Sequence, residues 1–316
     1  MMSLPDTAAD RWFAQRTFQH EDFPLSWLLE RKTQSVSVLL PARNVARTVG
    51  AIIDQIRPLQ QAGLVDELIV VDVNSPDGTA AVAAGHGAQV LQRNTVFAHL
   101  GPSQGKGDGM WRALAACRGE IVVYLDADTE DFHDGFVRGL IGPLLTSPQI
   151  SMVKGAFSRP FTQGAQRTES GGGRVTELAV RPLLSMYAPD LTGFVQPLAG
   201  EVALRRHLAE QLPFEVGYGV EIGMLLDAYA TVGLMGLAQC RLGSRTQAHQ
   251  PLDALSRMSY AVMAAAADRL GLPPAAGSAL QRPRDGQLIA EPVPLQRRPA
   301  LARMAATPVA EHVLAR

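Results

Sequence analysis

The sequence predicts an α/β protein built around a doubly wound sheet of mostly parallel strands. Short apolar runs alternate, in the first half of the chain, with segments whose apolar residues recur at helical spacing. The runs are mostly apolar, as expected for strands that helices cover on both faces. Four loops of this half carry polar or glycine residues at strand ends, and the last begins with Asp126-Ala127-Asp128.

The first half supplies four strands and three helices in alternation. The first strand spans residues 36–40, and we expect Pro41 to end it because proline cannot donate to a strand ladder. The next elements are a helix at 48–56, a strand at 68–71, a helix at 79–84, a strand at 89–91, a helix at 109–116 and a strand at 121–125. This order favours parallel pairing through helical crossovers.

The pattern is less regular after Asp128. We expect a strand at 152–154 and helices at 136–145, 175–186, 203–211, 220–231 and 251–270. Residues 162–173 are polar and glycine-rich, which indicates a mobile or ligand-shaped loop. Residues 1–34 form a polar, partly helical lead-in. Residues 271–316 are rich in Pro, Ala, Arg and Gln without periodicity, so we expect most of this tail to be disordered.

Composition narrows the function classes. The 316 residues carry a formal net charge of −1, so no basic field favours nucleic acid. Cys117 and Cys240 lie far apart without metal or disulfide spacing, which fits a reducing compartment. No apolar stretch approaches the roughly 18 residues of a membrane span, and the N-terminus has no signal-peptide core. We expect a soluble, cytoplasmic protein without membrane or nucleic-acid partners.

Asp126 and Asp128 are the most informative residues of the chain. Two carboxylates separated by one residue at the end of a buried strand repel each other and resist desolvation. A divalent cation would resolve this conflict, and oxygen ligands suit Mg²⁺ or Mn²⁺, which often bind a substrate diphosphate as well. The alternative is a surface loop that carries this short motif by chance.

The other strand-end loops fit a nucleotide site. They contain Pro41-Ala42-Arg43-Asn44, Asp72 and Gly105-Lys106-Gly107, and the ends of parallel strands share one edge of the sheet. Asp72 could accept hydrogen bonds from a base or ribose. Lys106 could approach a diphosphate closely because its glycine neighbours carry no side chain. For Asp72, a simple turn through residues 72–78 is the alternative.

The chain resembles retaining glycosyltransferases of the GT-A fold, and more narrowly the glucosyl-3-phosphoglycerate synthases. The broad resemblance rests on VSVLLPARN (residues 36–44), DELIVVD, GKGDGMWRAL and IVVYLDAD in this order. The narrower one rests on GGGRVTEL, QPLAGE, and the segment from Pro213-Phe214 to GYGVEIG. It covers roughly residues 35–270, with a nucleotide-binding half at 35–130 and an acceptor-binding half at 131–270.

The resemblance implies a role for each matching residue. Asp126 would contact the nucleoside, and Asp128 would hold the metal on the diphosphate. Glu221 would contact the transferred sugar, and it joins Asp128 and Lys106 as the catalytic set. The implied donor site consists of Pro41, Ala42, Arg43, Asn44, Asp72, Lys106, Asp126 and Ala127. The implied acceptor site consists of Gly173, Arg174, Thr176, Leu198, Tyr218, Glu221 and Arg245. A planar guanidinium such as that of Arg174 suits a carboxylate or phosphate.

Three departures from the family pattern fall near the donor. Gln247 stands where the family has a metal-binding histidine, and His249 lies two residues further on. Residues two apart on an extended segment are roughly 6.6 Å apart, so His249 could serve as the metal ligand only after a local shift. Val45 and Val73 replace a family glutamate and serine.

These features predict a metal-dependent retaining transfer of a sugar from a UDP- or GDP-sugar to a small anionic acceptor. The family resemblance also implies a homodimer. The departures favour a copy recruited to secondary metabolism, for example one resembling the lincosamide-pathway S-glycosyltransferase, which joins a GDP-octose to ergothioneine. The alternative is an ordinary glucosyl-3-phosphoglycerate synthase using UDP- or GDP-glucose. A sugar-1-phosphate nucleotidyltransferase and a non-enzymatic nucleotide binder are lesser alternatives.

Overall fold

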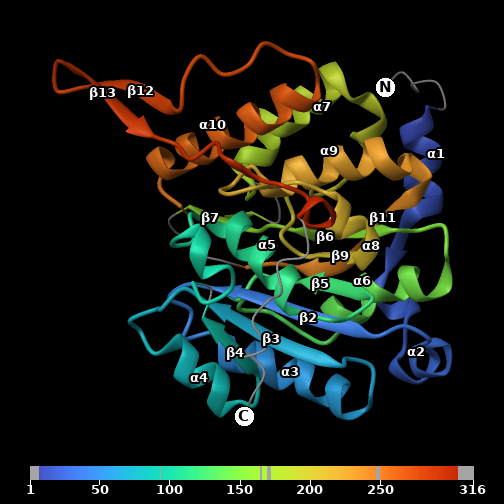
Figure 1. Cartoon of the computed structure of the whole chain (residues 1–316). Helices are drawn as coiled ribbons and strands as arrows, with labels where there is room; N and C mark the ends of the chain where they lie inside the picture. The colour runs from blue at the N-terminus through green and yellow to red at the C-terminus, as the bar shows by residue number, and fades with distance from the viewer. Residues whose placement is uncertain (1–6, 93, 164–165, 169–171, 247–249, 305–316) are drawn as a thin grey trace.

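The computed structural model describes residues 7–92, 94–163, 166–168, 172–246 and 250–304. Within these residues the central sheet has eight strands in the order β1-β11-β6-β9-β5-β2-β3-β4 (Figure 1). The strands are β1 (Thr17–Gln19), β2 (Val36–Ala42), β3 (Glu67–Asp72), β4 (Gln89–Gln92), β5 (Ile121–Tyr124), β6 (Met152–Ser158), β9 (Val202–Arg205) and β11 (Leu237–Ser244). Neighbours pair in parallel except β9, which is antiparallel to β5 and β6. The mixed α/β architecture is the one predicted.

Helices cover both faces of the sheet, and each face has its own core. The first core lies under α2 (Leu25–Arg31), α3 (Val49–Gln61), α4 (Thr79–Gly85) and α6 (Gly135–Thr146). The second lies under α1 (Ala8–Arg16), α5 (Lys106–Ala116), α7 (Arg181–Tyr187), α8 (Arg206–Gln211), α9 (Val220–Val232) and α10 (Leu252–Arg269). Strand β2 serves both: Val38 and Leu40 enter the first core and Leu39 the second. None of the helices in the described part is long and apolar enough to span a bilayer.

Three predicted boundaries in the first half are wrong by two residues or more, and the largest difference is in α3, which runs to Gln61, five residues past its predicted end. Strand β2 continues through Pro41 to Ala42. The backbone groups of Leu39 and Pro41 face β5, but β2 pairs with β5 only as far as Leu39. The missing N–H of Pro41 therefore costs no hydrogen bond of the sheet. Helix α5 begins at Lys106, three residues before the predicted start, so Lys106 lies at a helix N-terminus.

The predicted helix at 203–211 is wrong in its first part. Residues Val202–Arg205 are strand β9, and only Arg206–Gln211 are helical. Strand β9 pairs with β5 on one side and β6 on the other, and this pairing overrides local propensity. Strand β11 had no counterpart in the prediction, and the strand predicted at 152–154 extends to Ser158.

The N-terminal lead-in is part of the folded body. Trp12 of α1 is fully buried, and its indole N–H donates to the Leu237 carbonyl at 2.8 Å. Leu28 of α2 is also fully buried, whereas Phe13 is partly exposed. Strand β1 pairs with β11 at the edge of the sheet. The sheet therefore extends into the first 34 residues.

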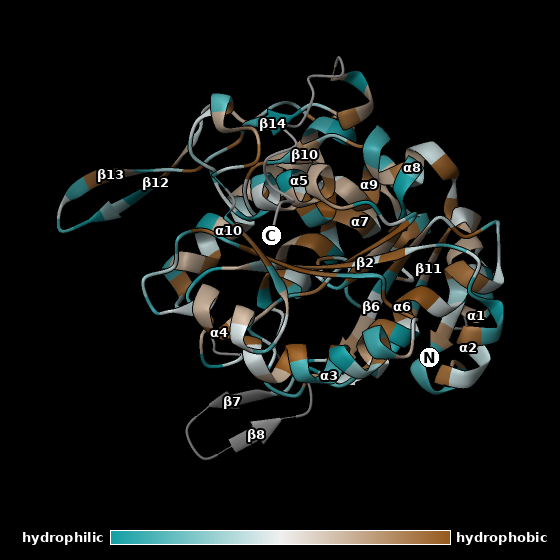
Figure 2. Ribbon diagram, turned by 60° about the horizontal axis from the view of Figure 1, so that its bottom comes forward, coloured by the Kyte–Doolittle hydropathy of each residue, from teal (hydrophilic) through white to brown (hydrophobic). Residues whose placement is uncertain are grey.

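The expectation of disorder from residue 271 onward is wrong for the described part of the tail. Strands β12 (Ala279–Arg284) and β13 (Gln287–Pro292) form a hairpin that projects from the body (Figure 2). Strand β14 (Arg297–Arg298) then pairs with β10 (Phe214–Glu215). The tail is held by long-range pairing and by side-chain hydrogen bonds, neither of which produces sequence periodicity. A short second hairpin, β7 (Phe161–Gln163) with β8 (Gln166–Thr168), lies within the predicted polar loop.

Candidate active site

A cavity of about 600 Å³ lies at the edge of the sheet where β2 and β5 end. Fourteen of the predicted site residues line it: Pro41, Ala42, Arg43, Lys106, Asp126, Ala127, Asp128, Gly173, Arg174, Thr176, Leu198, Tyr218, Glu221 and Arg245. Asn44 and Asp72 do not line it, and His249 lies outside the described residues. The fold thus brings together loops that are far apart in the sequence.

Asp126 is the centre of an ion network on the cavity floor. Its Oδ1 lies 2.7 Å from the Lys106 ammonium, and its Oδ2 lies 2.8 Å from the Arg245 guanidinium. Lys106 also lies 2.7 Å from a carboxylate oxygen of Glu221. Burial disfavours the charge on Asp126, but Lys106 and Arg245 outweigh it and hold the pKa of Asp126 well below its usual range. Asp126 is therefore ionised across the physiological pH range.

Arg245 extends the network to two further carboxylates. Its guanidinium lies 3.0 Å from Asp128 and 3.1 Å from Glu201, which is fully buried. Burial raises the pKa of Glu201, Asp126 adds to the effect and Arg245 opposes it. The resemblance implied a substrate role for Arg245, yet its charged contacts within the described residues are with the acids of the site, and its Nε donates to the Thr129 hydroxyl at 3.2 Å. Its placement balances their charge.

Close packing explains the glycines around Lys106. A Cβ on Gly107 would lie 1.9 Å from the carbonyl oxygen of Glu215, so only glycine lets α5 pack against this segment. From the sequence, these glycines were expected to let a diphosphate approach Lys106. Gly200 has a similar effect on the floor, because a Cβ there would lie 2.5 Å from Asp126. Lys106 remains at the start of α5, where backbone N–H groups favour an anion.

Asp128 is the carboxylate best placed for a metal. Its side chain is 51% exposed at the cavity wall. Among the described residues no three His, Cys, Asp or Glu side chains gather closely enough to form a complete metal site. Mg²⁺ and Mn²⁺ are, however, often held by one or two carboxylates together with substrate phosphates. The donor set fits a cation that binds with a diphosphate, and Asp128 is the residue that would hold it.

Asp72 and Asn44 lie beside the cavity in neighbouring loops, where Asp72 is buried and Asn44 is exposed. Asp72 pairs in register with the cavity residue Ala42, and its Oδ2 accepts hydrogen bonds from the Ser75 N–H and from Gln92. Within the described residues its buried Oδ1 has no hydrogen-bond partner, although Asp72 does not line the cavity. The Asn44 N–H donates to Ser75 at 3.0 Å. The turn interpretation explains the rest of this loop and leaves that one oxygen unexplained.

Cationic side chains dominate the lining of the cavity. In the described part of the chain they are Arg43, Lys106, Arg159, Arg174, Arg245 and Arg257, against the acids Asp126, Asp128 and Glu221. Arg174 donates to the Gln250 carbonyl at 2.7 Å, and the buried Thr176 lies two residues on. This excess of positive charge suits a ligand with several negative charges.

Several residues at the site were missed by the sequence argument. Glu201 and Arg159 belong to it, as do Pro292, Val293 and Pro294 from the tail. Lys154 lies beneath it, 1% exposed, and donates to the Ala199 carbonyl at 2.9 Å. A single lysine inside the apolar strand at 152–154 was the available signal for it. No local signal marks the tail, because its position depends on distant contacts.

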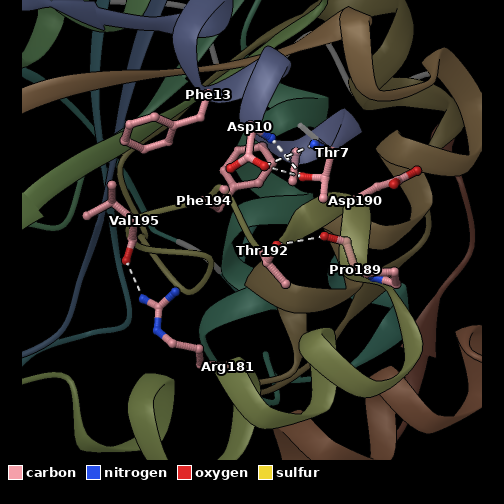
Figure 3. A pocket seen from close by; sticks show the side chains of 11 residues that line it. Thr7, Asp10, Phe13, Arg181, Pro189, Asp190, Thr192, Phe194 and Val195 are labelled. Carbon is pink, nitrogen blue, oxygen red and sulfur yellow. Dashed lines mark hydrogen bonds between the residues drawn. The ribbon is translucent and has the colours of Figure 1, made fainter. Parts of the chain in front are cut away.

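A second cavity, of about 580 Å³, lies between α1 and the segment at 189–195 (Figure 3). Several of its polar groups are engaged in hydrogen bonds within the fold, as when Tyr229 donates to Asp190 at 2.7 Å. Thr7 and Asp10 form the N-terminal capping box of α1, Arg181 donates to the Val195 carbonyl, and Thr192 donates to the Pro189 carbonyl. It contains none of the predicted site residues. The cavity at the sheet edge is therefore the candidate active site.

Comparison with known proteins finds several similar relatives. The family model described as glycosyl transferase family 2 matches residues 37–190. Glucosyl-3-phosphoglycerate synthase of Mycolicibacterium smegmatis is 43% identical over 263 residues, which cover 83% of this chain and 86% of that protein. The corresponding protein of Mycobacterium tuberculosis H37Rv is 46% identical over 245 residues, covering 76% and 75% of the two chains.

Two solved structures are similar over almost the whole chain. A mannosyl-3-phosphoglycerate synthase from Rubrobacter xylanophilus has a TM-score of 0.85 and 43% identity, covering 93% of this chain and 99% of the other. The M. tuberculosis glucosyl-3-phosphoglycerate synthase in complex with Mn²⁺, UDP-glucose and phosphoglyceric acid has a TM-score of 0.83 and 41% identity, covering 92% and 99%. The same enzyme has also been solved with Mg²⁺ and UDP.

Proposed function

This chain belongs to the glucosyl-3-phosphoglycerate synthase-like members of glycosyl transferase family 2, and from that premise we propose that it transfers glucose from UDP-glucose to 3-phosphoglycerate. The observation that carries the proposal is the cavity itself. It joins an exposed carboxylate, Asp128, to a wall with an excess of cations. A sugar nucleotide and a phosphorylated carboxylic acid are both anionic, so they complement the positive charge of this wall.

The proposed transfer retains the configuration at the sugar. The bond from the anomeric carbon to the diphosphate breaks, and a bond from that carbon to the acceptor hydroxyl forms on the same face. The hydroxyl proton passes to the departing phosphate oxygen. Lys106 would stabilise the charge that develops on the diphosphate, and Glu221 would contact the sugar. Asp128 would hold Mg²⁺ or Mn²⁺, which supplies Lewis-acid stabilisation of the leaving group.

The acceptor would lie toward Arg174 and Thr176. Arg174 offers a planar fork that matches a carboxylate or phosphate, and Gly173 and Thr176 lie on the same wall. A substrate with both anionic groups can engage this wall while its hydroxyl faces the sugar. Burial lowers the pKa of Arg159, and Arg245 adds to the effect, so a bound anion would relieve repulsion between these two cations.

Two other substrates rank below this proposal. The similarity to a mannosyl-3-phosphoglycerate synthase favours a mannose donor such as GDP-mannose as the second candidate. Transfer of a GDP-octose to ergothioneine, which the sequence argument placed first, has no support among the relatives. Its basis was Val45, Val73 and Gln247, and these changes affect only the donor side.

Purified protein with Mn²⁺ and 3-phosphoglycerate tests the proposal directly. UDP-glucose, GDP-glucose and GDP-mannose are supplied in parallel, and product is followed by mass spectrometry. We expect UDP-glucose to give the largest kcat/KM. A preference for GDP-mannose would replace the donor in the proposal. Turnover of ergothioneine without turnover of 3-phosphoglycerate would overturn the acceptor assignment.

A further inference from the structure

The C-terminal strap, defined as residues 292–299, joins the cavity wall to the helix that carries Lys106. At one end Pro292, Val293 and Pro294 line the cavity. At the other end β14 pairs with β10, and Figure 2 places these two strands beside α5. The Gln296 carbonyl accepts from the Val216 N–H at 2.9 Å. The strap is therefore continuous with the site described above.

Two arginines hold the strap to the body: Arg297 contacts Glu215 and Asp268, and Arg298 contacts the buried Asp108. The Nε of Arg298 donates to Oδ1 of Asp108 at 2.8 Å and its Nη2 to Oδ2 at 3.2 Å, a bidentate pair. Asp108 has no exposed surface. Burial opposes its charge, but Arg298, the Gln104 N–H and Arg112 hold its pKa below the usual value. Nearby, the Trp111 indole N–H donates to the Pro299 carbonyl at 2.9 Å.

Asp108 also fixes the turn on which Lys106 lies. The Gln104 N–H donates to Oδ2 of Asp108 at 2.9 Å, so one carboxylate bridges the residues two before and two after Lys106. The Asp108 N–H in turn donates to the Val216 carbonyl at 3.1 Å. Removing Arg298 would leave a fully buried carboxylate with less compensation, and its other partners would have to move. Lys106 lies between Gln104 and Asp108, so this movement would displace it.

We propose that Arg298 is a positioning residue for the donor half of the site: by holding Asp108 it keeps Lys106 where a leaving diphosphate is stabilised. The inference rests on the proposed function for the role of Lys106. It gives the tail a part in catalysis although Arg298 itself does not line the cavity. A displacement of about 1 Å at such a group costs roughly 100-fold in rate.

The test compares Arg298→Met with Arg303→Met, an exposed arginine just beyond the strap. We expect Arg298→Met to lower kcat by roughly 10- to 100-fold, to weaken nucleotide binding and to leave the acceptor KM nearly unchanged. Arg303→Met should match the wild type in all three. Asp108→Asn should act in the same direction, and the double variant should be no worse than the more affected single variant, because both changes break one contact.

Each outcome decides the proposal. Equal kcat and equal nucleotide affinity for Arg298→Met and Arg303→Met would overturn it. If thermal unfolding shows that Arg298→Met does not fold, Arg298→Lys decides, since it keeps the charge without the fork: reduced kcat supports the proposal and wild-type kcat overturns it. If the wild type turns over none of the donors, the proposed function fails separately, and calorimetric affinity for UDP or GDP with Mn²⁺ still compares the variants.

Discussion

Asp128 is the exposed end of the ion network, and its chemistry differs from that of its buried neighbour. Asp126 is held between Lys106 and Arg245, so its oxygens are already engaged. Asp128 contacts Arg245 through Oδ1, and about half of its side chain faces the cavity. A carboxylate in that position can accept a cation without losing the buried network. We therefore expect Asp126 to hold the ion network together and Asp128 to bind the cation.

Asp128→Asn should lower turnover by roughly 100-fold or more, because the amide is a poor ligand for the cation that stabilises the leaving group. The unfolding free energy should change by less than about 1 kcal/mol, the range of an exposed ion pair. Kinetic assays across a Mn²⁺ titration and urea unfolding give both numbers. Glu130→Gln is the matched control, as Glu130 is similarly exposed and pairs with Arg47. Unchanged kinetics in Asp128→Asn would remove Asp128 from the site.

Burial of the charged Lys154 side chain lowers the stability of the fold. The side chain is buried, and burial lowers its pKa to about 8, although Glu221 and Glu201 oppose the shift. Below pH 8 the lysine is charged in both the folded and the unfolded chain, and the burial cost is fully present. Between pH 8 and about 10.5 the folded state releases the proton first, so the unfolded state binds more protons and stability rises with pH.

Lys154→Met should therefore be more stable than the wild type near pH 7. The shift corresponds to roughly 3 kcal/mol, from which the lost hydrogen bond to Ala199 subtracts about 1 kcal/mol. The advantage of the variant should shrink as pH rises from 8 to 10.5. Urea unfolding of both proteins at pH 7, 8, 9 and 10 measures the difference, in which groups common to both cancel. A difference independent of pH would show that Lys154 does not titrate in this window.

At the scale of elements, the N-terminus of α5 depends on one contact that sequence patterns do not reveal. Gly107 packs directly against the Glu215 carbonyl, so α5, β10 and the strap meet at this point. The hydrophobic periodicity of the segment predicted a helix but placed its start three residues late. The start is fixed by packing and by Asp108, and a polar helix end carries no apolar repeat.

Gly107→Ala should destabilise the protein by about 1–3 kcal/mol, the usual cost of overpacking, since its Cβ would clash with backbone atoms that cannot move alone. Gly85→Ala is the control: Gly85 ends α4, is exposed, and has open space around the new Cβ. That change should stabilise slightly, by up to about 1 kcal/mol, through helix propensity. Chemical denaturation separates the two. Equal stability of the two variants would contradict the packing argument.

The difference between patterns within a segment and contacts between segments explains which elements could be predicted. Strands β2, β3 and β5 are continuous apolar runs, and helices α3, α6 and α9 follow helical spacing, so the sequence located them. Strand β9 was mistaken for helix because its short segment gains strand geometry only by pairing with both neighbours. The strap has no apolar repeat and is held by Arg298, Trp111 and β10. Patterns within a segment cannot report contacts between segments.

At the scale of the whole molecule, the site is assembled from loops that span most of the chain. The sequence predicted the loops at 41–44 and 126–128 because parallel strands end at a common edge. It could not predict that Glu201 reaches the same floor, since this requires knowing that β9 runs antiparallel and begins at that edge. Nor could it predict that residues 292–294 line the same cavity as the aspartates. These contributions became visible only with the complete topology.

Because so many segments meet at the cavity, a bound nucleotide should stabilise the whole fold. At 100-fold excess over Kd a ligand adds about 2.7 kcal/mol, or roughly 4 °C in Tm for a chain of this size. We expect UDP with Mn²⁺ to give the largest shift in a thermal-unfolding assay, GDP with Mn²⁺ a smaller one, and UDP alone the least. In Asp128→Asn the Mn²⁺-dependent part should disappear while any shift from UDP alone remains. A larger shift with GDP would move the donor toward a GDP-sugar, and equal shifts with and without Mn²⁺ would argue that the cation does not join the nucleotide at Asp128.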